Sequence, residues 1–187
     1  MTTKKQEKIK FSKAFWVANT VELFERAAYY GVFIVITLYL SRILGFNDIQ
    51  AASIAGIFSA CLYLLPTFAG ALADKIGFRN SMLLAFTLLT CGYLGLAVYP
   101  TWLQSAGLVE YSTTTTFTGL LESNLQYGII PIMALIVCGG AFIKSVISGT
   151  VAKETTPETR AKGFSIFYAM VNICLLYTSP SPRDPKT

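Results

Sequence analysis

The chain has 187 residues, of which 53% are apolar and only 13% charged, and its formal net charge is +5. So large an apolar share excludes an ordinary water-soluble domain, and the regular spacing of apolar residues excludes a disordered chain. The sequence contains no histidine, which excludes His-dependent metal sites and catalytic triads. We therefore expect a membrane protein with neither a metal nor another cofactor.

Charged residues divide the chain into long apolar segments. No Asp, Glu, Lys or Arg occurs between Asp48 and Asp74, between Arg79 and Glu110, or between Glu122 and Lys144. Each gap exceeds the roughly 20 apolar residues that a membrane-spanning helix needs. We predict an all-α, polytopic transmembrane helix bundle with spans at 14–44, 48–73, 80–101 and 126–151. Residues 101–125 are expected to form an external loop.

The basic residues gather on one side of these spans. Lys4, Lys5, Lys8, Lys10 and Lys13 precede the first span, Lys75 and Arg79 follow the second, and Lys153, Arg160 and Lys162 follow the fourth. On the opposite side only Arg42 is basic. Because cytoplasmic loops carry an excess of Lys and Arg, this distribution predicts that residues 1–13 are a cytoplasmic N-terminal segment. The positive charge is thus explained by a lipid bilayer, not by a nucleic-acid partner.

A fifth helix is predicted to begin near Gly163 and to remain an incomplete span. Two prolines and a charge pair within residues 174–184 would stop it. The tail also resembles the translation of a sequencing adaptor, so we expect residues 174–187 to be non-native. Residues 14–173 would then be part of a larger N-terminal transmembrane bundle.

Four polar residues of the first span share one helix face. Glu22, Glu25, Arg26 and Tyr29 are spaced three and four residues apart. A charge at membrane depth costs several kcal/mol unless it is paired or faces water, so we expect this face to line the interior of the bundle. Lys144 is the only charged residue of the predicted fourth span.

These ionisable groups could respond to a proton. With both carboxylates ionised, Glu22, Glu25, Arg26 and Lys144 sum to zero charge, and one added proton leaves +1. Two close carboxylates in a low dielectric resist being ionised together. Proton occupancy could therefore decide whether the cavity attracts an anionic solute, so we predict proton coupling at these four residues.

Two other readings of the charges remain. In a non-transporting membrane protein, the buried charges would be static ion pairs that hold helices together. In an intramembrane hydrolase, Glu22 and Glu25 would act as acid and base, but carboxylates three residues apart point the same way and do not flank a bond.

Three motifs resemble those of the proton-dependent oligopeptide transporter family of the major facilitator superfamily. They are Glu22-Leu-Phe-Glu25-Arg26-Ala-Ala-Tyr29-Tyr30-Gly31, Gly139-Gly-Ala-Phe-Ile-Lys144 and Phe164-Ser-Ile-Phe-Tyr168-Ala-Met-Val-Asn172-Ile173. The resemblance implies the N-terminal part of a proton-coupled symporter, not an enzyme, in the plasma membrane, with a bacterial inner membrane expected. It implies an alternating-access mechanism completed by a C-terminal bundle of the same protein.

The same resemblance implies which residues contact a small peptide or peptide-like solute. These are Tyr29, Tyr30, Tyr63, Lys144 and Asn172. Many members of the family carry a second arginine seven residues after the first, where this chain has Phe33, and proline usually follows the lysine, where this chain has Ser145. Because that arginine helps to hold the peptide carboxylate, a relative with a non-peptide substrate remains an alternative.

Between the second and third spans, Gly70-Ala-Leu-Ala-Asp74-Lys75-Ile-Gly77-Phe-Arg79 resembles a loop motif of major facilitator transporters. We expect Asp74 to end the second helix, Gly77 to permit a tight turn, and Asn80 or Ser81 to cap the third helix. Gly70, Asp74, Gly77 and Arg79 would then form a cytoplasmic gate, with Asp74 paired to Arg79 and facing a helix N-terminus of the second bundle. The alternative is an ordinary turn whose charges only set topology.

Overall fold

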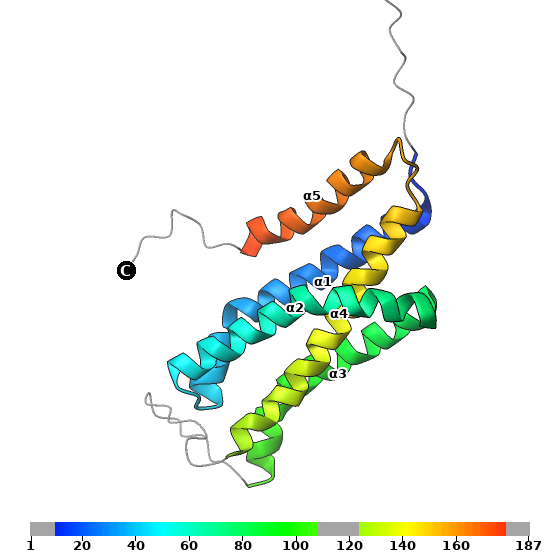
Figure 1. The fold of residues 1–187 in the computed structure, drawn as a ribbon. Helices are drawn as coiled ribbons and strands as arrows, with labels where there is room; N and C mark the ends of the chain where they lie inside the picture. Colours follow the sequence, from blue (N-terminus) through cyan, green and yellow to red (C-terminus); the bar gives the residue numbers. More distant parts are fainter. Residues whose placement is uncertain (1–9, 108–123, 179–187) are drawn as a thin grey trace, which may run out of the picture. The chain divides into compact units, whose positions relative to one another are not determined.

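The computed structural model describes residues 10–107 and 124–178, with side chains described as far as residue 173. Within these ranges the chain is helical and contains no β-strand. The helices are α1 (Lys13–Leu38), the π-helix η1 (Tyr39–Ile43), α2 (Asp48–Ile76), α3 (Phe78–Ser105), the 3₁₀ helix η2 (Asn124–Gly128), α4 (Ile129–Lys153) and α5 (Arg160–Thr178), shown in chain order from blue to red in Figure 1.

In the described part of the chain, four helical segments are long and apolar enough to cross a membrane. They are Lys13–Ile43, Asp48–Ile76, Phe78–Ser105 and Asn124–Lys153. The predicted all-α class and the four complete spans are therefore confirmed. Large apolar side chains such as Phe24 and Phe68 are exposed, at 70% and 75%, which suits the outer surface of a helix that faces lipid.

The chain forms two compact units. One consists of Met1–Ala27 with Ile147–Thr187, and the other of Ala28–Val146. Helices α1 and α4 each contribute residues to both units.

In the unit Ala28–Val146, glycines bring α3 and α4 into close contact. A Cβ atom added at Gly92 would lie 2.5 Å from Ile136 Cγ1, and one added at Gly139 would lie 2.8 Å from Leu89 Cγ and 3.0 Å from the Ala85 carbonyl oxygen. Helices α3 and α4 run alongside each other in Figure 1. Packing of small residues replaces the hydrophobic effect as the force that joins helices in lipid.

Hydrogen bonds from side chains to backbone carbonyls tie further helices of this unit together. Ser145 Oγ on α4 donates to the Pro66 carbonyl on α2 at 2.6 Å. Tyr39 OH on η1 donates to the Leu96 carbonyl on α3 at 2.7 Å. A hydrogen bond between helices satisfies a polar side chain that lipid could not satisfy.

The turn between α2 and α3 is tighter than the sequence predicts. Helix α2 continues through Asp74 to Ile76, and Gly77 alone separates it from α3, for which it is the N-terminal cap residue. The φ angle of Gly77 is +89°, a conformation that glycine adopts readily because it has no Cβ. The predictions that Asp74 ends the second helix and that Asn80 or Ser81 caps the third were wrong, because this one residue reverses the chain.

The fifth helix also differs from its predicted limits. It begins at Arg160, before Gly163, directly after a turn in which the backbone N–H of Thr156 donates to Thr159 Oγ1 at 3.0 Å and the Arg160 N–H donates to the Thr156 carbonyl at 2.8 Å. It continues to Thr178, past the expected limit at residue 173, because proline first interrupts the apolar run at Pro180.

The expected loop between the third and fourth spans and the two ends of the chain are described only in part. Helix α3 extends to Ser105, so the expected external loop at 101–125 begins later than predicted. Residues 108–123 lie outside the described part of the chain. Residues 1–9 and 179–187 do so as well, and the expectation of a non-native tail at 174–187 stays a prediction.

A buried charged cluster as candidate functional site

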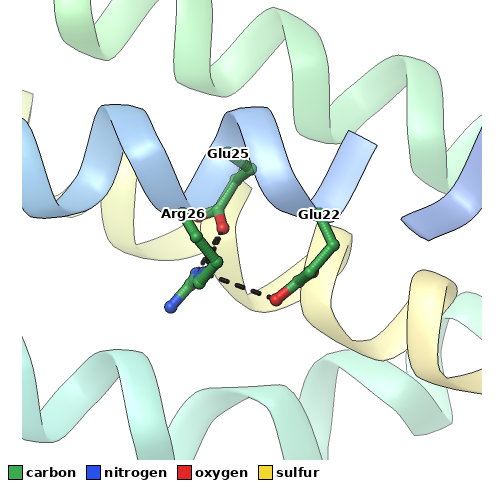
Figure 2. Close-up of polar contacts among 3 residues, drawn as sticks. All are labelled: Glu22, Glu25 and Arg26. Atoms are coloured by element: carbon green, nitrogen blue, oxygen red, sulfur yellow. Dashed lines mark hydrogen bonds and ion pairs between the residues drawn. The ribbon is translucent and has the colours of Figure 1, made fainter. Parts of the chain in front are cut away.

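The first span carries a cluster of charged side chains that are almost completely buried. Glu22 is 1% exposed, Glu25 8% and Arg26 2%. Arg26 Nε lies 3.4 Å from Glu22 Oε1, and Nε and Nη2 each lie 2.5 Å from Glu25 Oε2. Figure 2 shows the guanidinium contacting both carboxylates. The three residues share a buried face of α1, as their spacing predicts, while their role in proton coupling stays a prediction.

The three side chains of the cluster carry a net charge when all are ionised, and the two ion pairs differ in length. Two ionised carboxylates and one guanidinium sum to −1, so one added proton would make the three groups neutral. Glu25 is held more closely by Arg26 than Glu22 is, at 2.5 Å against 3.4 Å. The closer contact of Arg26 is therefore the one with Glu25.

Sequence reasoning missed Asn19, which lies on the same side of α1 three residues before Glu22. Its side chain is fully buried, and Nδ2 donates to the Phe15 carbonyl at 2.8 Å. Among the described residues, Asn19 Oδ1 has no hydrogen-bond partner. The spacing of three residues to Glu22 and seven to Arg26 was the signal that could have found it.

The predicted substrate residue Tyr29 is packed into the unit Ala28–Val146. It is 4% exposed, and its hydroxyl lies 3.3 Å from Ser59 Oγ on α2. Its ring stacks on Phe33, with centroids 5.6 Å apart, and lies 5.3 Å from the ring of the half-buried Tyr30. Phe33 thus fills the position of the missing arginine with an aromatic contact. The roles of Tyr29 and Tyr30 in binding a solute stay predictions.

Two other predicted substrate residues lie together. Lys144 Nζ on α4 lies 4.2 Å from the centroid of the Tyr63 ring on α2. A cation over an aromatic face is attracted by the electrons of the ring. Tyr63 is 62% exposed, whereas Lys144 is half-buried.

The predicted site residues are divided between the two units. Glu22, Glu25 and Arg26 belong to the same unit as Asn172, whose side chain on α5 is exposed, while Tyr29, Tyr30, Tyr63 and Lys144 belong to the other. The predicted grouping of Lys144 with the two glutamates stays a prediction.

The predicted gate residues lie around the turn after α2. Asp74 and Arg79 are exposed, and no ion pair in the described ranges involves either of them, so the expected Asp74–Arg79 pair is not formed. A Cβ added at Gly70 would lie 3.7 Å from Ser145, which is ordinary van der Waals contact. Gly77 forms the turn described above, and the gating role of these residues stays a prediction.

Over most of its length the chain is similar to bacterial permeases. It is 30% identical over 168 residues to the dipeptide and tripeptide permease A of Salmonella typhi and, to the same extent, of Salmonella typhimurium; these matches cover 86% of this chain and 28% of each permease. It is 29% identical over 183 residues to the dipeptide and tripeptide permease A of Escherichia coli K12, covering 89% of this chain and 35% of that protein.

The chain therefore spans only 28 to 35% of the length of these relatives. No family model matches the chain. No solved structure matches it either. The four apolar helices and the similarity to bacterial permeases support a multi-pass membrane protein.

Proposed function

We propose that this chain is the N-terminal part of a proton-coupled symporter for di- and tripeptides or a related small solute. The observation that carries the proposal is the burial of Glu22, Glu25 and Arg26 together in an apolar, span-length helix. Ionisable groups at such a depth are costly and mark ion or substrate pathways. The similarity to permeases named for dipeptides and tripeptides supports the substrate class.

Protonation of the cluster is the proposed coupling step. Glu22, which lies further from Arg26 than Glu25 does, loses less attraction when it becomes neutral. One proton changes the three groups from −1 to neutral, and with Lys144 the sum changes from zero to +1. Protonation would make the site more positive, so a solute carboxylate would be bound more strongly, which links solute binding to proton binding.

Lys144 and Tyr63 are the proposed contacts for the solute carboxylate. Lys144 brings a positive charge, and its Nζ lies 4.2 Å from the centroid of the Tyr63 ring. Tyr29, Tyr30 and Asn172 would contact the rest of the solute. Because Phe33 replaces a second arginine, the carboxylate would be bound by Lys144 without a bidentate partner from α1.

The complete transporter would combine this bundle with a C-terminal bundle of the same protein. The substrate and proton sites would lie between the two bundles, and the bundles would open alternately to each side. Gly70, Asp74, Gly77 and Arg79 would form the cytoplasmic gate. The N-terminus would face the cytoplasm of a bacterium, and the protein would lie in the inner membrane.

The test is uptake of a dipeptide by the full-length protein in proteoliposomes. An inward proton gradient should accelerate uptake in the unchanged protein. Glu22→Gln should abolish that acceleration, because the carboxyl group that takes up the proton in this proposal is then absent. Equal uptake with and without the gradient, together with full activity after neutralising both glutamates, would refute the proposal.

A non-transporting protein with structural ion pairs is the alternative from another class. The ion pairs of Arg26 with Glu22 and with Glu25 lie within α1, so they do not themselves join two helices. Replacing Glu22 and Arg26 together by leucine and methionine separates the two cases. A structural pair tolerates such a replacement, because apolar residues of similar size often pack at least as stably, whereas a symporter loses proton-driven uptake.

A further inference from the structure

Asn19 presents a buried hydrogen-bond acceptor next to the charged cluster. Its Nδ2 donates to the Phe15 carbonyl at 2.8 Å, and since a carbonyl only accepts, this bond fixes which end of the amide is nitrogen. The remaining atom, Oδ1, is buried and has no partner among the described residues. A buried acceptor without a donor is unfavourable, so a donor that arrives during the working cycle would be bound strongly.

The nearest candidate donor on the same helix face is the carboxyl group of Glu22. Residues three apart on a helix are neighbours, with Cβ atoms roughly 5–6 Å apart. Arg26, the other donor on this face, is engaged with Glu22 and Glu25. An ionised carboxylate only accepts hydrogen bonds, whereas a protonated one also donates. Glu22 and Asn19 Oδ1 are therefore two acceptors until Glu22 takes up a proton.

In the unit that contains Asn19, no described charged side chain other than Glu22, Glu25 and Arg26 is a candidate donor to Asn19 Oδ1, because all the others are exposed. These exposed residues are Lys10, Lys13, Lys153, Glu154, Glu158, Arg160 and Lys162. Glu25 has its own donor, since Arg26 Nε and Nη2 both contact its Oε2 at 2.5 Å.

We propose that Asn19 positions the coupling proton on Glu22, because Asn19 Oδ1 accepts a hydrogen bond from the protonated Glu22 carboxyl. This inference rests on the proposed function and adds a residue to it. In the protonated state Asn19 holds Glu22 and Arg26 holds Glu25, so each carboxyl group has its own partner. When the proton leaves, Glu22 turns back into an acceptor and relies on Arg26.

The test measures how uptake of a dipeptide by the full-length protein depends on pH in proteoliposomes. Asn19→Leu has nearly the same size but neither accepts nor donates. It should move the midpoint of the pH dependence by about one pH unit toward acid, a tenfold loss of proton affinity, which is the size of one hydrogen bond. Exchange of labelled for unlabelled dipeptide at saturating acidity should keep its rate, because the proton is then bound in either case.

Thr20→Val is the matched control. Thr20 Oγ1 donates to the Trp16 carbonyl at 2.9 Å, the same four-residue pattern as Asn19 Nδ2 to Phe15, but on the exposed side of α1. It should leave the midpoint unchanged. Asn19→Ala serves as a second variant should leucine not be accommodated, and it should shift the midpoint in the same direction.

Combination with Glu22→Gln isolates the proposed partner. In that background Asn19→Leu should have no effect on the pH dependence of exchange, because the group that would donate the proton is gone. An unshifted midpoint for Asn19→Leu and Asn19→Ala overturns the inference while proton-driven uptake by the unchanged protein upholds the proposed function. A loss of the same factor at every pH overturns it too, since that is the result of a purely structural role. If a proton gradient does not accelerate uptake by the unchanged protein, both the inference about Asn19 and the proposed function are overturned.

Discussion

Lys144 Nζ lies 4.2 Å from the centroid of the Tyr63 ring, so a cation on α4 rests on an aromatic face presented by α2. This contact favours one position of the lysine side chain, although the ring itself is largely exposed. A cation held in place by an aromatic ring loses less conformational freedom when it binds an anion than a lysine that moves freely.

Two replacements of Tyr63 should distinguish the contribution of its ring to solute binding from the contribution of its hydroxyl. A cation–π contact contributes roughly 0.5–2 kcal/mol, so Tyr63→Leu should raise the KM of dipeptide uptake by about 2- to 30-fold, whereas Tyr63→Phe should change it little. Phe68→Leu, at another exposed aromatic residue of α2, is the control and should have no effect. If the phenylalanine variant were as impaired as the leucine variant, the hydroxyl and not the ring would be the important group.

Phe33→Arg should improve the binding of solutes with a free carboxylate. Phe33 is 38% exposed and stacks on Tyr29, and a guanidinium can keep that stacking while it offers a bidentate pair of donors. The KM for a dipeptide should fall several-fold, while the KM for the same dipeptide with an amidated C-terminus should not. Phe33→Met controls for the loss of the ring, and an equal gain for both solutes would contradict the prediction.

A structural feature could be predicted from the sequence only where its physical cause produces a recognisable local pattern of residues. The bilayer demands a long uncharged segment for every crossing, so the gap between Asp48 and Asp74 alone locates α2. The turn at Gly77 was harder, because Asp74, Asn80 and Ser81 are all plausible at helix ends and only the positive φ of the glycine decides between them.

The candidate site was predictable only in part for a related reason. Glu22, Glu25 and Arg26 stand out because charges are rare in apolar helices. Asn19 does not, since an uncharged amide barely disturbs an apolar pattern, and its burial became visible only in three dimensions. The contact of Tyr29 with Ser59 depends on how α1 and α2 are rotated toward each other, which neither sequence segment specifies alone.

Gly139→Ala should destabilise the unit Ala28–Val146. The new Cβ would lie 3.0 Å from the Ala85 carbonyl oxygen and 3.0 Å from the Leu89 nitrogen, and backbone atoms cannot move aside as the end of a side chain can. Overpacking of this kind costs about 1–3 kcal/mol, measurable as a lower thermal unfolding temperature of the full-length protein in detergent. Gly56→Ala, with no atom within 4 Å of its Cβ, is the control. Equal unfolding temperatures for the two variants would contradict the close packing of α3 on α4.

Glu25→Gln should lower the stability of the full-length protein more than Glu22→Gln does. Arg26 contacts Glu25 with two nitrogens at 2.5 Å but lies 3.4 Å from Glu22, and loss of a partner leaves a buried guanidinium less well compensated. Breaking a buried ion pair costs about 3–5 kcal/mol. Because the contact of Arg26 with Glu22 is longer, Glu22→Gln should lower the stability less than Glu25→Gln. Thermal unfolding in detergent at neutral pH measures both variants, with the exposed Glu158→Gln as control. The reverse order would mean that Glu22 is the main partner of Arg26, and Glu25 would then be the better candidate to carry the proton.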